Sequence, residues 1–185
     1  MNIHTFLITG THALLMHNPS SMTNGSSSNK LGSKVIPTPA EEAAASRYLT
    51  DDGAHLWVPC EGVKACAVSG AKGRRIGKNF ATTIIRGTVF PAEDRSILLD
   101  AKTLKPIKSD SYEIDTRRAR VNEAGILRSR AKISNWAAKI PFEIDELVSP
   151  DIVLECLNLG GRTCGLLDFR PECGGPFGRF SAKLL

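Results

Sequence analysis

Residues 173–185 read Cys-Gly-Gly-Pro-Phe-Gly-Arg-Phe-Ser-Ala-Lys-Leu-Leu, a glycine-rich turn directly before a short closing strand. Glycine adopts positive φ without penalty and lets a backbone approach a partner closely. Arginine can form two parallel hydrogen bonds with a phosphate group. The stretch therefore predicts a strand at the end of the chain and, beside it, a loop that contacts a polyanion through Gly175, Gly178 and Arg179.

The segments before this strand alternate between strands and helices. Thr38 and Ser149 each precede a proline, which is typical of a helix N-terminus because the first helical residue needs no amide hydrogen. The stretch 113–145 is strand-like, with a hairpin turn at 121–126. We expect helices at 38–48, 61–72 and 149–161, and strands at 3–9, 55–58, 80–90, 96–99, 126–134, 137–144, 166–169 and 179–184.

Without the inserted segments, the order is strand, helix, two or three antiparallel strands, helix, strand. This is the βαββαβ order of a ferredoxin-like or RRM-like α+β domain, an antiparallel sheet with its helices on one face. The 185 residues suffice for one such domain, 1–185, with a core of its own. Segment 18–37 contains a Ser/Asn/Gly-rich run that cannot bury much surface, so we expect a mobile loop there.

The composition favours an intracellular protein that binds an acidic partner. The formal net charge is +5, which fits a nucleic-acid binder without requiring one. The five cysteines include no C-x-x-C pair, and no metal-ligand spacing occurs, so we expect reduced thiols, no metal and no cofactor. No apolar run approaches the roughly 18 residues of a membrane span, and the N-terminus is a poor signal peptide. We expect a cytoplasmic location and no membrane partner.

The strongest physical signal is a basic hairpin in the middle of the chain. Seven basic residues and one acidic residue lie between 117 and 139. Residues at alternate positions of a strand share a face, and like charges on one face repel unless an anion neutralises them. A phosphate backbone would do so. The alternative is a solvated face whose acids come from elsewhere in the fold. The predicted phosphate-contacting face comprises Arg118, Arg120, Arg128, Arg130 and Lys132.

A second basic cluster comprises Arg74, Arg75 and Lys78. It resembles a Walker A loop only superficially, because Lys72 occupies the first glycine position and Asn79 the hydroxyl position. The cluster therefore predicts phosphate contact without nucleotide hydrolysis, or a plain solvated loop. We expect it to extend the binding surface, with Arg170 beside the glycine-rich loop.

His12 and His17 flank an apolar segment, and Trp136 follows the basic strand. Either histidine could act as acid or base in metal-free RNA cleavage, because histidine titrates near neutral pH. A structural role is the alternative for both. Trp136 could stack on a nucleobase or pack in the core.

Three segments resemble the RAMP superfamily, the Cas5, Cas6 and Cas7 type proteins of CRISPR systems. Residues 56–66, Leu-Trp-Val-Pro-Cys-Glu-Gly-Val-Lys-Ala-Cys, resemble its strand-Pro-helix segment, although Cys60-Glu61 replaces the usual Gly-Ser. Residues 174–180 are similar to the C-terminal glycine-rich loop of that superfamily. Residues 3–19 are similar to its first strand and the polar segment that follows it. The chain also resembles small phage and prophage proteins with a Leu-Leu-Met-His-Asn-Pro start, here 14–19, and an Asp-Phe-Arg-Pro finish, here 168–171.

The resemblance implies binding of single-stranded RNA or DNA, more readily RNA, without catalysis. It also implies assembly of copies along the strand, or association with CRISPR-type subunits, in the host cytoplasm if the protein is phage-encoded. One alternative is a metal-free Cas6-like endoribonuclease using His12 or His17. Another is a phage interaction protein that mimics a CRISPR subunit and blocks a host complex.

Overall fold

The computed structural model of the protein describes residues 1–19, 37–121 and 124–185. Among these, the side chains of residues 119–121 and 124–125 are not described. Most of the mobile loop predicted at 18–37 and the tip of the predicted hairpin therefore lie outside the described residues.

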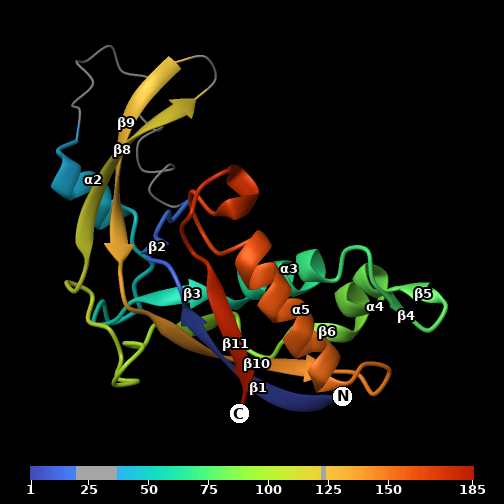
Figure 1. The fold of residues 1–185 in the computed structure, drawn as a ribbon. Coiled ribbons are helices and arrows are strands. Elements are labelled where there is room, and N and C mark those ends of the chain that lie inside the picture. Colours follow the sequence, from blue (N-terminus) through green and yellow to red (C-terminus); the bar gives the residue numbers. More distant parts are fainter. Residues whose placement is uncertain (20–36, 122–123) are drawn as a thin grey trace, which may run out of the picture.

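The body of the protein is a four-stranded antiparallel sheet with two helices on one face (Figure 1). The strands are β1 (Asn2–Gly10), β6 (Val89–Pro91), β10 (Ala137–Ile144) and β11 (Phe180–Leu184), in the spatial order β11-β1-β10-β6. The helices are α3 (Cys60–Gly70) and α5 (Pro150–Thr163). This is the βαββαβ arrangement of a ferredoxin-like domain, so the predicted fold class is confirmed.

Alternation along the strands separates a buried face from an open one. Phe6 and Ile8 of β1 are fully buried beneath the helices, as are Ile140 and Phe142 of β10. The rings of Phe6 and Phe142 meet edge to face, with centroids 6.0 Å apart. Because side chains alternate across a strand, the residues between these point to the face that the helices leave uncovered.

Helices α3 and α5 approach each other through glycine. A Cβ atom added to Gly160 would lie 1.8 Å from the carbonyl oxygen of Cys66, and one added to Gly70 would lie 2.0 Å from that of Cys156. Only a residue without a side chain allows the two backbones this contact. At Gly70 and Cys66, α3 therefore packs against α5.

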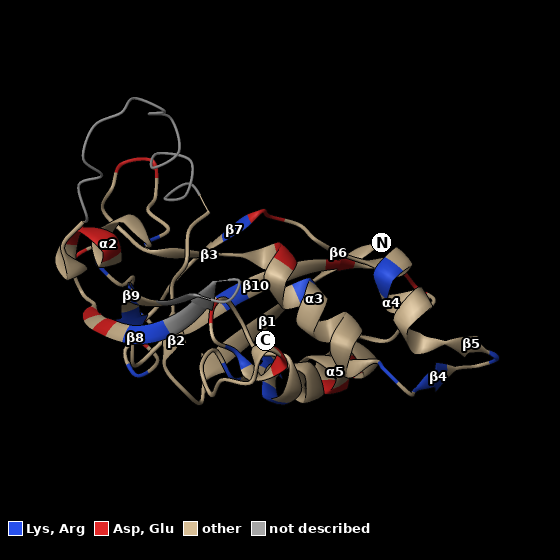
Figure 2. Cartoon of the chain, turned by 90° about the horizontal axis from the view of Figure 1, so that it is seen from above, with Lys and Arg blue, Asp and Glu red and all other residues tan. Residues whose placement is uncertain are grey.

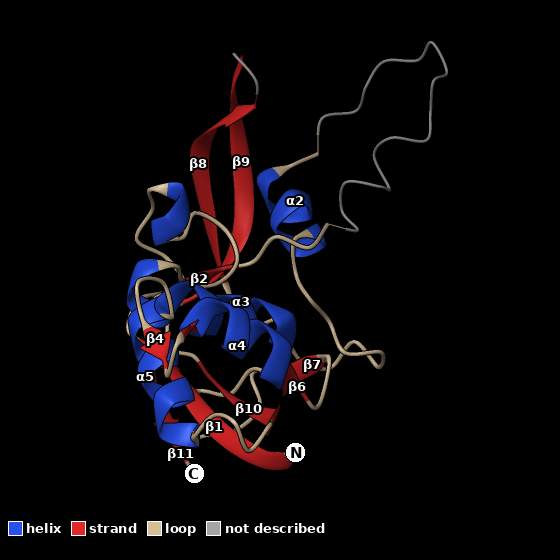
Figure 3. Cartoon of the chain, turned by 90° about the vertical axis from the view of Figure 1, so that its right-hand side faces the viewer, coloured by secondary structure: helices blue, strands red, loops and turns tan. Residues whose placement is uncertain are grey.

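A long hairpin projects from the body between β6 and β10 (Figures 1 and 3). It consists of β8 (Glu113–Val121) and β9 (Ala124–Ile133), and β2 (Leu14–Leu15) extends it to a three-stranded sheet. Helix α2 (Pro39–Ala45) covers the other part of the β9 edge. There the Glu42 carboxylate accepts a hydrogen bond from the Ser129 amide (2.8 Å), and the Ser46 hydroxyl accepts one from the Ala131 amide (2.9 Å).

The remaining elements correct two expectations. They are β3 (Trp57–Pro59) paired with β7 (Arg95–Ile97), β4 (Arg75–Ile76) paired with β5 (Asn79–Phe80), α4 (Ala81–Thr88) and the 3₁₀ turn η1 (Pro171–Cys173). The strand predicted at 80–90 is mostly helix α4, whose buried Ala81 and Ile85 recur at helical spacing. The segment 166–169 is not a strand, because Leu167 and Phe169 have positive φ.

Candidate nucleic-acid interface

The register of the β8–β9 hairpin distributes its cations over two faces. Arg117 lies opposite Arg128, and Arg118 lies opposite Leu127. Directly paired residues of an antiparallel ladder point to the same side. Arg128, Arg130 and Lys132 therefore share one face with Arg117, whereas Arg118 belongs to the other. The side chain of Arg120 is not among those described. The expectation that all five predicted residues form one face is wrong, because the register places odd-numbered β8 residues opposite even-numbered β9 residues.

Each described cation on the first of these faces has a carboxylate partner. Two partners come from outside the hairpin, Glu42 from α2 and Asp168 from the C-terminal segment. The pairs are Lys132–Glu113 (2.6 Å), Arg128–Glu42 (3.3 Å), Arg130–Asp168 and Arg117–Asp115 (2.5 Å). The acids thus come partly from elsewhere in the fold, as the alternative interpretation of this face proposed.

The C-terminal segment 165–179 packs against that face of the hairpin. The Arg117 guanidinium lies 4.6 Å from the centroid of the Phe177 ring, and the Asp168 carboxylate pairs with Arg130. Arg170 donates to the carboxylate of Glu172 (2.9 Å) and to the carbonyl of Leu167 (2.9 Å). The basic hairpin and the C-terminal segment, which are far apart in the sequence, are therefore in contact here.

The glycines of this loop allow it to fold on itself. A Cβ atom at Gly175 would lie 1.9 Å from the Phe169 carbonyl oxygen, and one at Gly178 would lie 2.0 Å from that of Leu166. Gly178 also has a φ of +67°, which favours glycine. These contacts account for both glycines without an anion.

Arg179 differs from the hairpin cations because its side chain has no partner among the described residues. Its Nε atom is buried without a hydrogen bond. The Arg179 carbonyl accepts from the amides of Thr11 (2.8 Å) and His12 (3.3 Å), which joins the loop to the end of β1. The exposed His12 and the free guanidinium of Arg179 thus belong to adjacent segments.

Trp136 is a core residue. Its ring is fully buried, and its Nε1 donates to the His12 carbonyl (2.9 Å). Gly10 provides the space, since a Cβ atom there would lie 2.3 Å from that nitrogen. Stacking of Trp136 on a nucleobase is excluded by this burial, and packing, the other interpretation, is correct.

The second basic cluster lies at the opposite end of the molecule from the hairpin (Figures 1 and 2). Arg74 pairs with Glu155 of α5 (2.6 Å), and Arg75 lies over the Phe80 ring (4.5 Å) while donating to the Lys78 carbonyl (2.9 Å). The cluster therefore does not extend the hairpin surface, because the whole body of the domain separates the two.

The open face of the four-stranded sheet carries two lysines that were not predicted as site residues. Leu7 of β1 lies between Lys139 of β10 and Lys183 of β11 in the register. Both lysines are exposed and have no ion-pair partner among the described residues, while Glu143 lies further along the same face of β10. The sequence signal for Lys139 is its position between two apolar residues, Ala138 and Ile140, which are buried on the opposite face of the strand.

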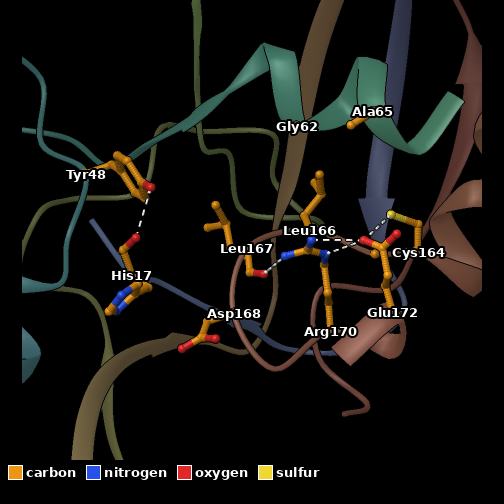
Figure 4. Close-up of a pocket in the computed structure, with 11 residues that line it drawn as sticks. His17, Tyr48, Gly62, Ala65, Cys164, Leu166, Leu167, Asp168, Arg170 and Glu172 are labelled. Carbon is orange, nitrogen blue, oxygen red and sulfur yellow. Dashed lines mark hydrogen bonds and ion pairs between the residues drawn. The ribbon is translucent and has the colours of Figure 1, made fainter. Parts of the chain in front are cut away.

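A cavity of about 370 Å³ lies between the start of α3 and the C-terminal segment (Figure 4). Tyr48 donates its hydroxyl hydrogen to the carbonyl of His17 (3.0 Å) at one end, and Arg170 pairs with Glu172 at the other. Burial lowers the pKa of His17, with a smaller opposing effect of Asp168. Burial therefore favours the neutral form of His17, which makes its imidazole a weaker base than that of a solvated histidine.

Within the described part of the chain, no group of three or more His, Cys, Asp and Glu side chains is arranged to hold a metal ion. No helix among the described residues has the length and apolar character needed to cross a membrane.

The fold is α+β and RRM-like, an antiparallel sheet with two helices on one face. No family model matches the sequence, and the comparison with curated proteins gives no match. The structure is similar to the crystal structure of Cmr6 from Pyrococcus furiosus, with a TM-score of 0.51 and 11% identity over 99% of this chain and 100% of that one. It is also similar to a chain of the Type III-B Cmr-beta complex bound to cognate target RNA, with a TM-score of 0.52 and 14% identity. That match covers 99% of this chain and 59% of the other.

Proposed function

We propose that the protein binds single-stranded RNA without cleaving it, as a subunit of a ribonucleoprotein assembly. The fold it shares with Cmr6 supports this, as does its likeness to a chain of a complex bound to target RNA. At these identities the likeness concerns the fold, so the binding surface is argued from this chain's own residues.

The observation that carries the proposal is a set of cations on and beside the open sheet face that have no partner among the described residues. Lys139 and Lys183 flank Leu7, and Arg179 directly precedes β11 with its Nε buried and without a hydrogen bond. A phosphate backbone supplies the acceptors and the negative charge that these groups lack. Adjacent strands lie about 4.8 Å apart, so the two lysines, two strands apart, can contact neighbouring phosphates.

The hairpin would contribute a second, weaker set of contacts. Arg118 is exposed and has no partner among the described residues. Lys132 and Arg128 are paired, yet a phosphate can replace an exposed carboxylate such as that of Glu113. Arg130, only 12% exposed and paired with Asp168, would position the C-terminal segment instead.

The proposal is tested by titrating labelled single-stranded RNA and single-stranded DNA of equal length and following fluorescence anisotropy. The double variant Lys139→Ser, Lys183→Ser should bind RNA on the order of tenfold more weakly, because two phosphate contacts are lost. Lys72→Ser, Arg86→Ser is the matched control, since both residues are exposed and lie outside the four-stranded sheet, Lys72 just after α3 and Arg86 in α4. Equal weakening by the two double variants would mean that only net charge matters.

Assembly along the strand is part of the proposal. Copies that bind side by side should form complexes whose mass rises stepwise with RNA length in size-exclusion chromatography with light scattering. A constant one-to-one stoichiometry on long RNA would contradict self-assembly. The protein would then be proposed to bind RNA together with other subunits.

Metal-free cleavage of RNA is a second candidate function, favoured by the position of His12. Its imidazole is exposed, and its amide is bonded to the Arg179 carbonyl, so a potential base and an unpaired guanidinium come from adjacent segments. Incubation with RNA in EDTA tests this. Cleavage that His12→Ala abolishes and His17→Ala retains would establish the nuclease, and intact RNA would exclude it for the substrates used.

A further inference from the structure

A groove of about 510 Å³ lies at the base of the projecting hairpin. Its lining comes from residues 100–113, which lead into β8, and from residues 132–135, where β9 gives way to β10. Figure 1 shows the first of these segments in yellow-green beside the base of the hairpin. Two β-bridges hold this segment in place, Leu99 with Pro106 and His55 with Lys108.

The two carboxylates that line this groove already have partners. Asp100 accepts hydrogen bonds from the amide (2.8 Å) and the hydroxyl (2.9 Å) of Thr103. Glu113 pairs with Lys132 (2.6 Å) and accepts a hydrogen bond from the Ser134 hydroxyl (2.8 Å). Neither carboxylate therefore neutralises the other cations of the groove.

Those other cations are Lys105 and Lys108, which line the groove and are exposed. Their ammonium groups have no ion-pair or hydrogen-bond partner among the described residues, and the same holds for the side chains of Ser111 and Asn135 beside them. A concave surface with charge of one sign attracts ligands of the opposite sign. The groove thus offers positively charged hydrogen-bond donors, the chemistry that recognises a phosphate group.

An aromatic ring borders the same groove. Tyr112 is half-buried, and the Arg47 guanidinium lies over its ring, 5.1 Å from the ring centroid. Arg47 is itself fixed, because it donates hydrogen bonds to the carbonyls of Ala44 (2.8 Å) and Ser109 (2.7 Å). The ring of Tyr112 is therefore held in one orientation. Aromatic rings in positively charged grooves stack on nucleobases with little dependence on base identity.

The groove lies close to the open sheet face along the chain. Asn135 lines the groove and precedes Lys139 of β10 by four residues. Even a fully extended chain spans at most about 14 Å over this interval. An RNA strand bound at Lys139 therefore needs to extend by only a few nucleotides to reach the groove.

We propose that this groove is a nucleotide-binding subsite for the RNA strand, in which Lys105 and Lys108 contact phosphates and Tyr112 stacks on a base. The subsite rests on the proposed RNA binding and extends it beyond the open sheet face. The groove adds an aromatic ring to the charge that Lys139 and Lys183 supply, so base stacking and phosphate contact occur on the same strand of RNA.

The affinity of a labelled single-stranded RNA tests the two lysines. The double variant Lys105→Ser, Lys108→Ser should bind on the order of tenfold more weakly than the wild-type protein, because two phosphate contacts are lost. Lys102→Ser, Lys78→Ser is the matched control with the same change in net charge, since both residues are exposed and neither lines the groove. Equal affinities of the two double variants would overturn the subsite. If Lys139→Ser, Lys183→Ser still weakened binding, the proposed function would stand without it, whereas absence of RNA binding by the wild-type protein would overturn both.

Photo-crosslinking tests the position of the RNA directly. RNA that contains 4-thiouridine is irradiated with the wild-type protein, which is then digested with trypsin. We expect crosslinks on peptide 109–117, which contains Tyr112, and on peptide 180–183 of β11. Tyr112→Phe should retain the affinity for RNA and Tyr112→Leu should reduce it, because only the first keeps an aromatic ring. Crosslinks on peptide 180–183 without any on 109–117, or equal affinities of the two Tyr112 variants, would overturn the subsite.

Discussion

Asp168 connects three parts of the molecule at the scale of a single residue. Its carboxylate pairs with Arg130 of β9, its amide donates to the Leu15 carbonyl of β2 (3.2 Å), and its side chain lines the cavity near His17. The Arg130 side chain is only 12% exposed, so removing the carboxylate would leave a charge in a largely buried position.

Asp168→Asn should therefore lower the free energy of unfolding by about 3 kcal/mol, the usual cost of breaking a buried ion pair. Urea denaturation measures this. The matched control is Asp51→Asn, because the Asp51 carboxylate pairs with Arg95 but is 93% exposed. An exposed pair contributes about 0–1 kcal/mol. Equal losses in the two variants would contradict the structural role assigned to Asp168.

The lowered pKa of His17 predicts that the free energy of unfolding depends on pH. Because burial lowers its pKa below the ordinary 6.5, the unfolded chain binds the proton more tightly than the folded protein does. The stabilising contribution is complete above pH 6.5 and is lost as the pH falls from there through the lower, folded-state pKa. His17→Gln should flatten the stability curve on this acidic side, and His4→Gln is the control. An unchanged slope in the His17 variant would contradict the assignment.

At the scale of elements, the crossing of α3 and α5 sets the shape of the body. Asn158 of α5 donates to the Ala182 carbonyl of β11, and Cys66 of α3 donates to the Gly165 carbonyl just after α5. The crossing depends on Gly70 and Gly160, where a side chain would collide with backbone rather than with a movable group.

Gly160→Ala should destabilise the protein by about 3 kcal/mol, the upper part of the range for overpacking, because the added carbon collides with the Cys66 carbonyl. Gly87→Ala is the matched control, since Gly87 also lies in a helix, α4, and has no atom within 4 Å of an added Cβ. It should raise stability by about 0.5–1 kcal/mol. Thermal unfolding followed by circular dichroism compares the two, and a tolerated Gly160→Ala would mean that the helices are further apart.

The sequence predicted most elements from local signals but not how they meet. The cap-then-proline starts of α2 and α5 and the strand-like stretch 113–145 were correct because they depend on neighbouring residues. Helix α4 was missed because its β-branched residues favour a strand, while its apolar face has helical spacing. The partners of Arg128 and Arg130 could not be predicted, since Glu42 and Asp168 reach them through tertiary contacts.

At the scale of the whole molecule, the basic residues separate into three regions. The hairpin face is neutralised by carboxylates of the hairpin, of α2 and of the C-terminal segment, and the Arg74–Lys78 cluster lies at the far end. On the open sheet face, Lys139 and Lys183 have no ion-pair partner among the residues that the structure describes. The formal net charge of +5 alone does not distinguish these regions. We therefore propose the open sheet face, rather than the other two regions, as the surface that binds a polyanion.

The salt dependence of RNA affinity tests whether Lys139 and Lys183 of the open sheet face contact phosphates. The dissociation constant of a labelled single-stranded RNA is measured at several salt concentrations for the wild-type protein and for Lys139→Ser, Lys183→Ser. We predict that the logarithm of affinity falls linearly with the logarithm of salt concentration, and that the slope shrinks by about 1.4 in the double variant, or about 0.7 for each phosphate contact. Absence of binding, or binding indifferent to salt, would contradict the claim.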